Sequence, residues 1–179
     1  PSMDILISSN LERLLYHLTD GNDAQVREWF GALKTTGRYE IPRELRDRIQ
    51  AEFSAAYYDD AATKATIGAI FAENGYLSDT HTAVGIAAAR DYTASAAEKL
   101  PMLVASTANP YKFSAAVLEA IGGTVDADDE YAVLDALNQR SGMAIPKALA
   151  ELKNKEVRFT DSVHREDMAE YVKVRLGIE

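Results

Sequence analysis

The side chains best suited to chemistry gather at the end of a short apolar run. Residues 103–105, Leu-Val-Ala, are followed by two hydroxyls, Ser106 and Thr107, and by an amide, Asn109. Ligands of open α/β sheets bind outside the carboxyl ends of parallel strands, so these groups are placed to hydrogen-bond a heteroaromatic ligand. The same residue types commonly cap helices such as one starting at Pro110, and spacing alone leaves both interpretations open.

The remaining candidates predict neither a metal site nor a nucleophile. His17, His81 and His164 are far apart, and none has a second ligand at the spacing of a helical metal motif. The acidic clusters at residues 59–60 and 126–130 lack the alternation and glycine of a calcium loop. With no cysteine, disulfides, thiolate nucleophiles and cysteine-based metal sites are excluded, and a cytoplasmic location is the default expectation.

Charge and hydropathy exclude two classes of partner. The net charge of −9, from 28 acidic and 19 basic residues, repels nucleic acids and anionic membranes. No apolar run approaches the roughly 20 residues that span a bilayer, and the N-terminus lacks a targeting pattern. We therefore expect no nucleic acid and no membrane partner. The length of 179 residues and 47% apolar content allow a sizeable core.

Helical spacing dominates the first half of the sequence. Leucines at helical spacing follow Ser9 until Gly21, and residues 21–76 continue in helical patterns with no strand signal. Before them, the apolar run Ile5 to Ile7 resembles the end of a strand, and the chain begins without an initiator methionine. We therefore expect a fragment that starts inside a structural element and continues into an all-helical region.

The second half alternates between helix and strand patterns. Asp79 and Thr80 are cap candidates for an alanine-rich helix, and residues 101–105 have the unbroken apolar character of a buried parallel strand. Further helices are expected after Pro110, near residues 130–138, from residue 146 and at residues 168–176, with a short strand at 157–160. This alternation predicts an α/β fold, helix-rich with a few parallel strands flanked by helices.

Three stretches of the sequence resemble the threonine synthase family. Residues 106–113, Ser-Thr-Ala-Asn-Pro-Tyr-Lys-Phe, resemble the family pattern of Ser or Gly, Thr-Ala, a polar residue, Pro, any residue and Lys-Phe. Residues 1–5, Pro-Ser-Met-Asp-Ile, with residues 8–15, Ser-Ser-Asn-Leu-Glu-Arg-Leu-Leu, form the second stretch, and residues 75–84, Gly-Tyr-Leu-Ser-Asp-Thr-His-Thr-Ala-Val, the third. They occur in the family's order, and the resemblance covers essentially the whole chain. The family more often has His at the position of Asn109 and Pro at that of Thr80.

The resemblance implies a pyridoxal 5′-phosphate enzyme of fold type II that converts O-phospho-L-homoserine and water to L-threonine and phosphate. In such enzymes the threonine that matches Thr107 hydrogen-bonds the pyridine nitrogen, so Thr107, with Ser106, is the expected cofactor-binding pair. The Schiff-base lysine lies upstream of Pro1 in the family, so no catalytic residue is assigned here. Lys112 is expected to be a solvated helix lysine. The chain is thus expected to be a C-terminal portion, inactive alone, whose partner is the missing N-terminal half.

The expected organisation has three parts. Residues 1–20 form a strand end and helix of the large domain, residues 21–76 an all-helical insert, and residues 77–179 the C-terminal part of the large α/β domain. Two alternatives stay open: a fragment of another fold type II lyase, or a helical interaction module suggested by the helical stretch. The buried-strand run before Ser106 argues against a purely helical module, which has no use for it.

Overall fold

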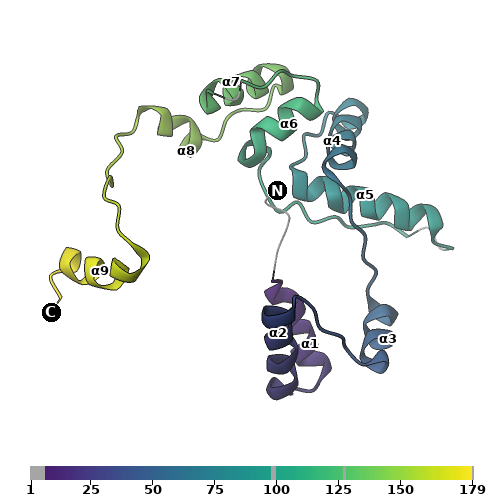
Figure 1. The fold of residues 1–179 in the computed structure, drawn as a ribbon. Coiled ribbons are helices and arrows are strands. Elements are labelled where there is room, and N and C mark those ends of the chain that lie inside the picture. The colour runs from purple at the N-terminus through teal and green to yellow at the C-terminus, as the bar shows by residue number, and fades with distance from the viewer. Residues whose placement is uncertain (1–6, 98–99, 127, 179) are drawn as a thin grey trace.

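The computed structural model describes residues 7–97, 100–126 and 128–178, and within these ranges regular structure is entirely helical (Figure 1). The α-helices are α1 Ser9–Leu18, α2 Asp23–Thr36, α3 Arg43–Glu52, α4 Asp60–Asn74, α5 Thr80–Ser95, α6 Ser114–Ala120, α7 Glu130–Ser141, α8 Lys147–Ala150 and α9 Met168–Leu176. Short 3-10 helices are η1 Pro110–Phe113, η2 Glu151–Asn154 and η3 Arg165–Asp167. None of the described helices is long and apolar enough to cross a membrane.

Local sequence signals explain where the longer helices begin and end. A side-chain oxygen accepts a hydrogen bond from the first turn of five helices, which satisfies amides that have no partner inside the helix. These N-cap residues are Ser8, Asn22, Asp59, Asp79 and Asp129. Helix α4 ends at Gly75, whose φ of 67° lies in the left-handed region that glycine adopts without steric cost.

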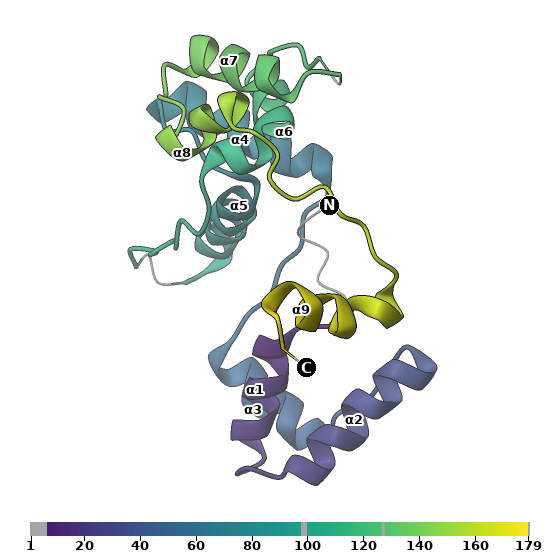
Figure 2. The same cartoon turned by 90° about the vertical axis from the view of Figure 1, so that its left-hand side faces the viewer.

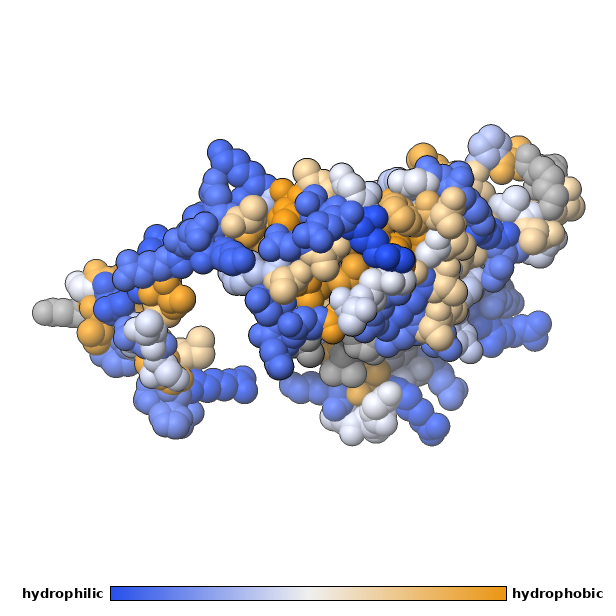
Figure 3. All heavy atoms as spheres, turned by 90° about the horizontal axis from the view of Figure 1, so that it is seen from above, coloured by the Kyte–Doolittle hydropathy of each residue, from blue (hydrophilic) through white to orange (hydrophobic). Residues whose placement is uncertain are grey.

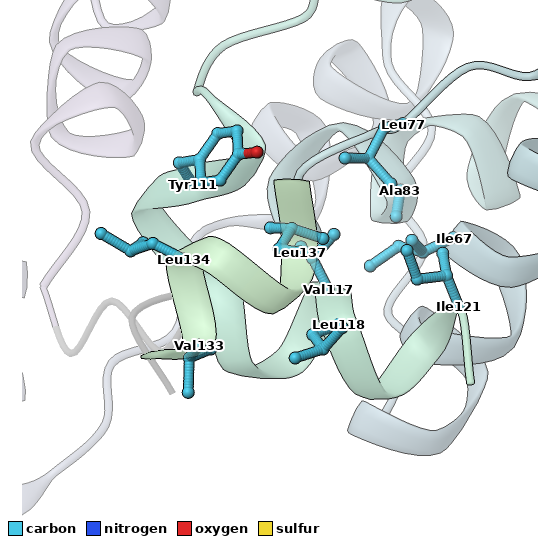
Figure 4. Close-up of a cluster of buried hydrophobic side chains, with 10 residues drawn as sticks. All are labelled: Ile67, Leu77, Ala83, Tyr111, Val117, Leu118, Ile121, Val133, Leu134 and Leu137. Carbon is cyan, nitrogen blue, oxygen red and sulfur yellow. The ribbon is translucent and has the colours of Figure 1, made fainter. Parts of the chain in front are cut away.

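The main core lies between α4, α5, η1, α6 and α7 (Figure 4). Its buried members are Ile67, Leu77, Ala83, Tyr111, Val117, Leu118, Ile121, Val133, Leu134 and Leu137. Helices α4 and α6 approach closely at Gly68, where an added Cβ atom would lie 2.6 Å from the carbonyl oxygen of Ala120. A glycine at this position therefore lets α4 pack directly against the α6 backbone.

A second, smaller core joins α1, α2 and α3, and both ribbon views place these helices apart from α4–α7 (Figures 1 and 2). It contains Leu15, Val26, Trp29 and Leu45, with the ring of Tyr39 stacked on Trp29 at 6.3 Å. The Arg48 guanidinium also donates to the Leu18 carbonyl at 2.7 Å, which ties α3 to the end of α1. The domain boundaries expected at residues 20 and 76 stay a prediction.

The parallel strands expected from the sequence are wrong for the residues that the structure describes. Residues 101–107 are non-helical, and their backbone makes no hydrogen bond to another described residue. The same holds for residues 156–163. A strand is defined by its ladder to a neighbour, and neither segment has such a neighbour here. Ile7 is also not in a strand, and the rest of that expected strand end, Ile5 and Leu6, lies outside the described residues.

The first of these segments runs beside α5. Val104 lies close to Gly85, where an added Cβ atom would meet the valine Cγ1 at 3.3 Å. Met102 and Val104 line a small hollow with Ile86 and Ala89 of the same helix. Leu103, between them, is 99% exposed. One face of the segment therefore packs on the small residues of α5 while the other is uncovered.

The C-terminal arm, residues 155–178, extends away from the main core (Figures 1 and 3). Its final helix, α9, was expected from apolar spacing at residues 168–176 and is confirmed. Its apolar side chains are nevertheless exposed, in contrast to those of the core helices. These exposed residues are Met168, Val172, Val174 and Leu176, followed by Ile178.

Candidate functional site

Ser106 and Thr107 lie at the end of the extended segment, where the chain turns into η1. The capping interpretation holds for Asn109 alone: its side chain accepts from the Tyr111 amide at 2.9 Å, as the N-cap of η1. Thr107 is exposed, and its hydroxyl makes no hydrogen bond to another described residue. Lys112 is exposed and places its ammonium 5.4 Å from the centre of the Phe113 ring.

A polar network holds Ser106 from two sides. The Tyr76 hydroxyl lies 3.1 Å from the Ser106 Oγ, and the Thr82 hydroxyl lies 3.5 Å from the same atom. Thr82 in turn donates to the Asp79 carboxylate, which also caps α5 by accepting from the His81 amide at 2.8 Å. Sequence reasoning missed the roles of Tyr76 and Thr82. The available signal was the joint presence of the two family-like stretches at residues 75–84 and 106–113.

The same run contains two buried polar atoms that have no hydrogen-bond partner among the described residues. They are the Oγ of Ser78, which is fully buried, and the Nε2 of His81. The His81 ring packs against Phe113 with 5.0 Å between centroids. Unsatisfied buried polar groups are uncommon in native proteins, and these two lie in the same run of residues as Tyr76 and Thr82, which contact Ser106.

The Thr107 hydroxyl has the hydrogen-bonding chemistry that the nitrogen edge of pyridoxal phosphate requires. A neutral pyridine nitrogen needs one hydrogen-bond donor, and the free hydroxyl of Thr107 can provide it. A carboxylate in that position holds a proton on the ring nitrogen, whereas a hydroxyl does not. The described residues thus offer a donor suited to an unprotonated ring.

Tyr111 anchors the turn that follows Thr107. Its side chain is buried in the main core, and its hydroxyl donates to the Met143 carbonyl. Burial raises the pKa of the Tyr111 phenol above its ordinary value. The phenol is therefore protonated at neutral pH and serves as a structural donor between η1 and the chain after α7.

A hollow beside this turn has a volume of about 1450 Å³ and is lined mainly by residues of α4, α5, η1, α6, α7 and α8. Asn109 and Lys112 reach its wall, but Ser106 and Thr107 do not. Across the described ranges, no cluster of three or more His, Asp or Glu side chains is arranged to hold a metal ion.

Comparison with known proteins places the sequence among threonine synthases. Residues 82–173 match the family model described as threonine synthase, C-terminal. The chain is 34% identical over 160 residues to the threonine synthase of Pseudomonas aeruginosa, covering 89% of this chain and 30% of the relative. It is 32% identical over 184 residues to that of Saccharomyces cerevisiae, covering 94% of this chain and 35% of the relative.

Two solved structures are similar over nearly the whole chain. A structure of pyridoxal-phosphate-bound threonine synthase from Brucella melitensis is 34% identical, with a TM-score of 0.73, over 97% of this chain and 33% of that one. The structure of yeast threonine synthase is 28% identical, with a TM-score of 0.76, over 99% of this chain and 36% of that one. The chain spans about a third of the length of these relatives. It belongs to the threonine synthase family.

Proposed function

We propose that this chain is the C-terminal part of a threonine synthase, which converts O-phospho-L-homoserine and water to L-threonine and phosphate with pyridoxal phosphate. The observation that carries the proposal is the hydroxyl of Thr107, which has no partner among the described residues and lies at the end of an extended segment within the family-like residues 106–113. Thr107 donates to the pyridine nitrogen, and Ser106 lines the same edge of the cofactor.

Pyridoxal phosphate supplies an electron sink for negative charge that develops on the substrate carbon atoms. A neutral donor such as Thr107 orients the ring without fixing a proton on its nitrogen, which keeps the sink weaker than an ion pair with a carboxylate makes it. The lysine that binds the cofactor belongs to the preceding part of the enzyme. Lys112 does not serve in its place, because it is exposed and lies over Phe113 on the helix surface.

The preceding part of the enzyme is also the proposed partner of the uncovered surfaces. The backbone groups of residues 101–107 and 156–163 have no hydrogen-bond partner among the described residues and can add to the edge of a sheet. The exposed apolar side chains of α9 need a similar cover. In this arrangement residues 1–20 and 77–179 belong to the large domain, and residues 21–76 form its helical insert.

The test is release of phosphate from O-phospho-L-homoserine, measured side by side for the 179-residue chain and for the longer protein that contains it. The longer protein should release phosphate and form threonine in equal amounts, and the chain alone should do neither. Release without threonine would indicate another lyase of the same fold. Turnover by the 179-residue chain alone would contradict the proposal.

A second test asks whether this chain holds the cofactor lysine. The chain is incubated with pyridoxal phosphate and reduced with borohydride, and any modified lysine is located by mass spectrometry. We expect no lysine to be labelled stoichiometrically. Stoichiometric labelling of a single lysine, above all Lys112, would overturn the assignment of the chain as a non-catalytic part.

A further inference from the structure

Two hydroxyls from a distant part of the sequence converge on Ser106. Tyr76 is 30 residues away and lies 3.1 Å from the Ser106 Oγ, whereas Thr82 is 24 residues away and lies at 3.5 Å. We propose that Tyr76 and Thr82 are positioning residues: they hold Ser106 and thereby aim the adjacent Thr107 at its ligand. The identity of that ligand rests on the proposed function, but the contacts themselves do not.

The hydrogen-bond inventory ranks the two contacts of Ser106. Thr82 has a single hydroxyl hydrogen, and the Asp79 carboxylate can only accept, so Thr82 donates to Asp79. The Thr82 hydroxyl, on the donor side of its 3.5 Å approach to the Ser106 Oγ, therefore adds a polar contact and not a second strong hydrogen bond. Tyr76 and Ser106 share the shorter bond of 3.1 Å, in which either oxygen can donate. Tyr76 is thus the main hold on Ser106, and Thr82 links the serine to the capped start of α5.

The two adjacent hydroxyls differ in their partners. Ser106 is bonded to Tyr76 and approached by Thr82. Thr107 makes no hydrogen bond to another described residue and keeps its hydrogen available. Ser106 thus orients the turn, and Thr107 is left to donate to a ligand.

The network is attached to the ends of two helices. Asp79 is 1% exposed and fixes the start of α5 by accepting from the His81 and Thr82 amides at 2.8 and 3.1 Å. Tyr76 directly follows Gly75, the C-cap of α4. Helices α4 and α5 pack against each other, so Ser106 is held between the end of one helix and the start of the next. Sites supported by helices in this way are held more firmly than sites on free loops.

The first test uses the 179-residue chain without cofactor. Backbone order parameters at Ser106 and Thr107 are measured by ¹⁵N relaxation in Tyr76→Phe and Thr82→Val variants. We expect them to fall from the rigid range near about 0.85 to below about 0.6. The matched controls are Tyr57→Phe, at an exposed tyrosine, and Thr66→Val, whose hydroxyl bonds only within α4. Unchanged order parameters in both test variants would overturn the proposal.

The second test uses the longer protein and its affinity for pyridoxal phosphate, followed by absorbance. Tyr76→Phe should weaken binding on the order of fivefold, the effect of one hydrogen bond. In a Ser106→Ala background the same change should have no further effect, because the tyrosine acts through the serine. Thr82→Ser, which keeps the hydroxyl, should bind the cofactor like the unmodified protein.

The two tests separate the network from the proposed function. Additive losses in Tyr76→Phe and Ser106→Ala would contradict the positioning role even if the protein is a threonine synthase. A longer protein that takes up no pyridoxal phosphate would instead remove the proposed function, and the order parameters would still decide whether the network holds Ser106 and Thr107.

Discussion

Helices α7 and α9 carry similar apolar patterns, but the apolar side chains of α7 are buried and those of α9 are exposed. In α7, Leu134 and Leu137 are buried in the main core, whereas in α9 Val172 and Leu176 are more than half exposed. Periodicity predicts that a helix forms and which face is apolar, but it does not identify the surface that covers that face. In α7 that surface is supplied by this chain, and in α9 it is not supplied by the residues that the structure describes.

The solved structures of relatives help to explain why the apolar side chains of α9 are exposed. They match 97% and 99% of this chain, with TM-scores of 0.73 and 0.76, although they are about three times as long. Much of the fold described here is therefore also found in chains that contain the additional two thirds. This supports the proposal that the arm packs on the remainder of a longer enzyme.

The largest change in the free energy of unfolding should come from a cavity in the main core. Leu137→Ala, at a fully buried position, should lower the free energy of unfolding by about 2–5 kcal/mol. Leu176→Ala in the arm should change it by less than about 0.5 kcal/mol. Chemical denaturation measures both. Equal losses would show that the arm is as well packed as the core.

The next effect should come from the close approach of α4 and α6. Gly68→Ala puts a methyl group 2.6 Å from the Ala120 carbonyl oxygen, and the shift it requires should cost about 1–3 kcal/mol. Gly31→Ala in α2 meets nothing within 4 Å and should instead stabilise by about 0.4–1 kcal/mol. A neutral Gly68→Ala variant would contradict the close contact between these helices.

A smaller effect is expected from the ion pair that links α4 to α6. Lys64 bonds Glu119 across the two helices, and this hydrogen bond raises the pKa of the lysine above 10.5. The stabilisation is therefore present below about pH 10.5 and is lost as pH rises through the raised pKa. Because both side chains are partly exposed, Lys64→Met should cost at most about 1 kcal/mol at neutral pH. A loss that stays unchanged as the pH rises through the raised pKa of Lys64 would argue against the ion pair as its cause.

The smallest change in the free energy of unfolding should follow removal of the C-terminal arm. A chain ending at Asn154 should unfold within about 0.5 kcal/mol of the 179-residue chain, because the arm adds few buried side chains. Trypsin should cut the 179-residue chain first after Lys155 and Arg158, which are exposed in an extended segment. In the longer protein the same sites should be protected. Cleavage at equal rates in both proteins would contradict the proposed cover.

Local patterns predicted the helices well. The cap at Asp79 and the final helix at residues 168–176 both agree with the structure. The strand expectations at residues 101–105 and 157–160 failed as secondary structure because a strand needs a ladder partner, which local patterning does not supply. The role of Thr107 was predicted from its motif and stays a prediction. The contacts of Tyr76 and Thr82 with Ser106 join residues far apart in sequence, and no local period reports such pairs.

The most direct test of the account compares Thr107→Val with Thr107→Ser in the longer protein. Pyridoxal phosphate affinity and phosphate release from O-phospho-L-homoserine are measured for both variants. Removing the hydroxyl should weaken cofactor binding and lower kcat/KM by about tenfold or more, as expected when an acceptor on the bound cofactor loses its hydrogen-bond donor, and Thr107→Ser should retain most of both. If Thr107→Val binds the cofactor and releases phosphate like the unmodified protein, the role assigned to this hydroxyl is wrong.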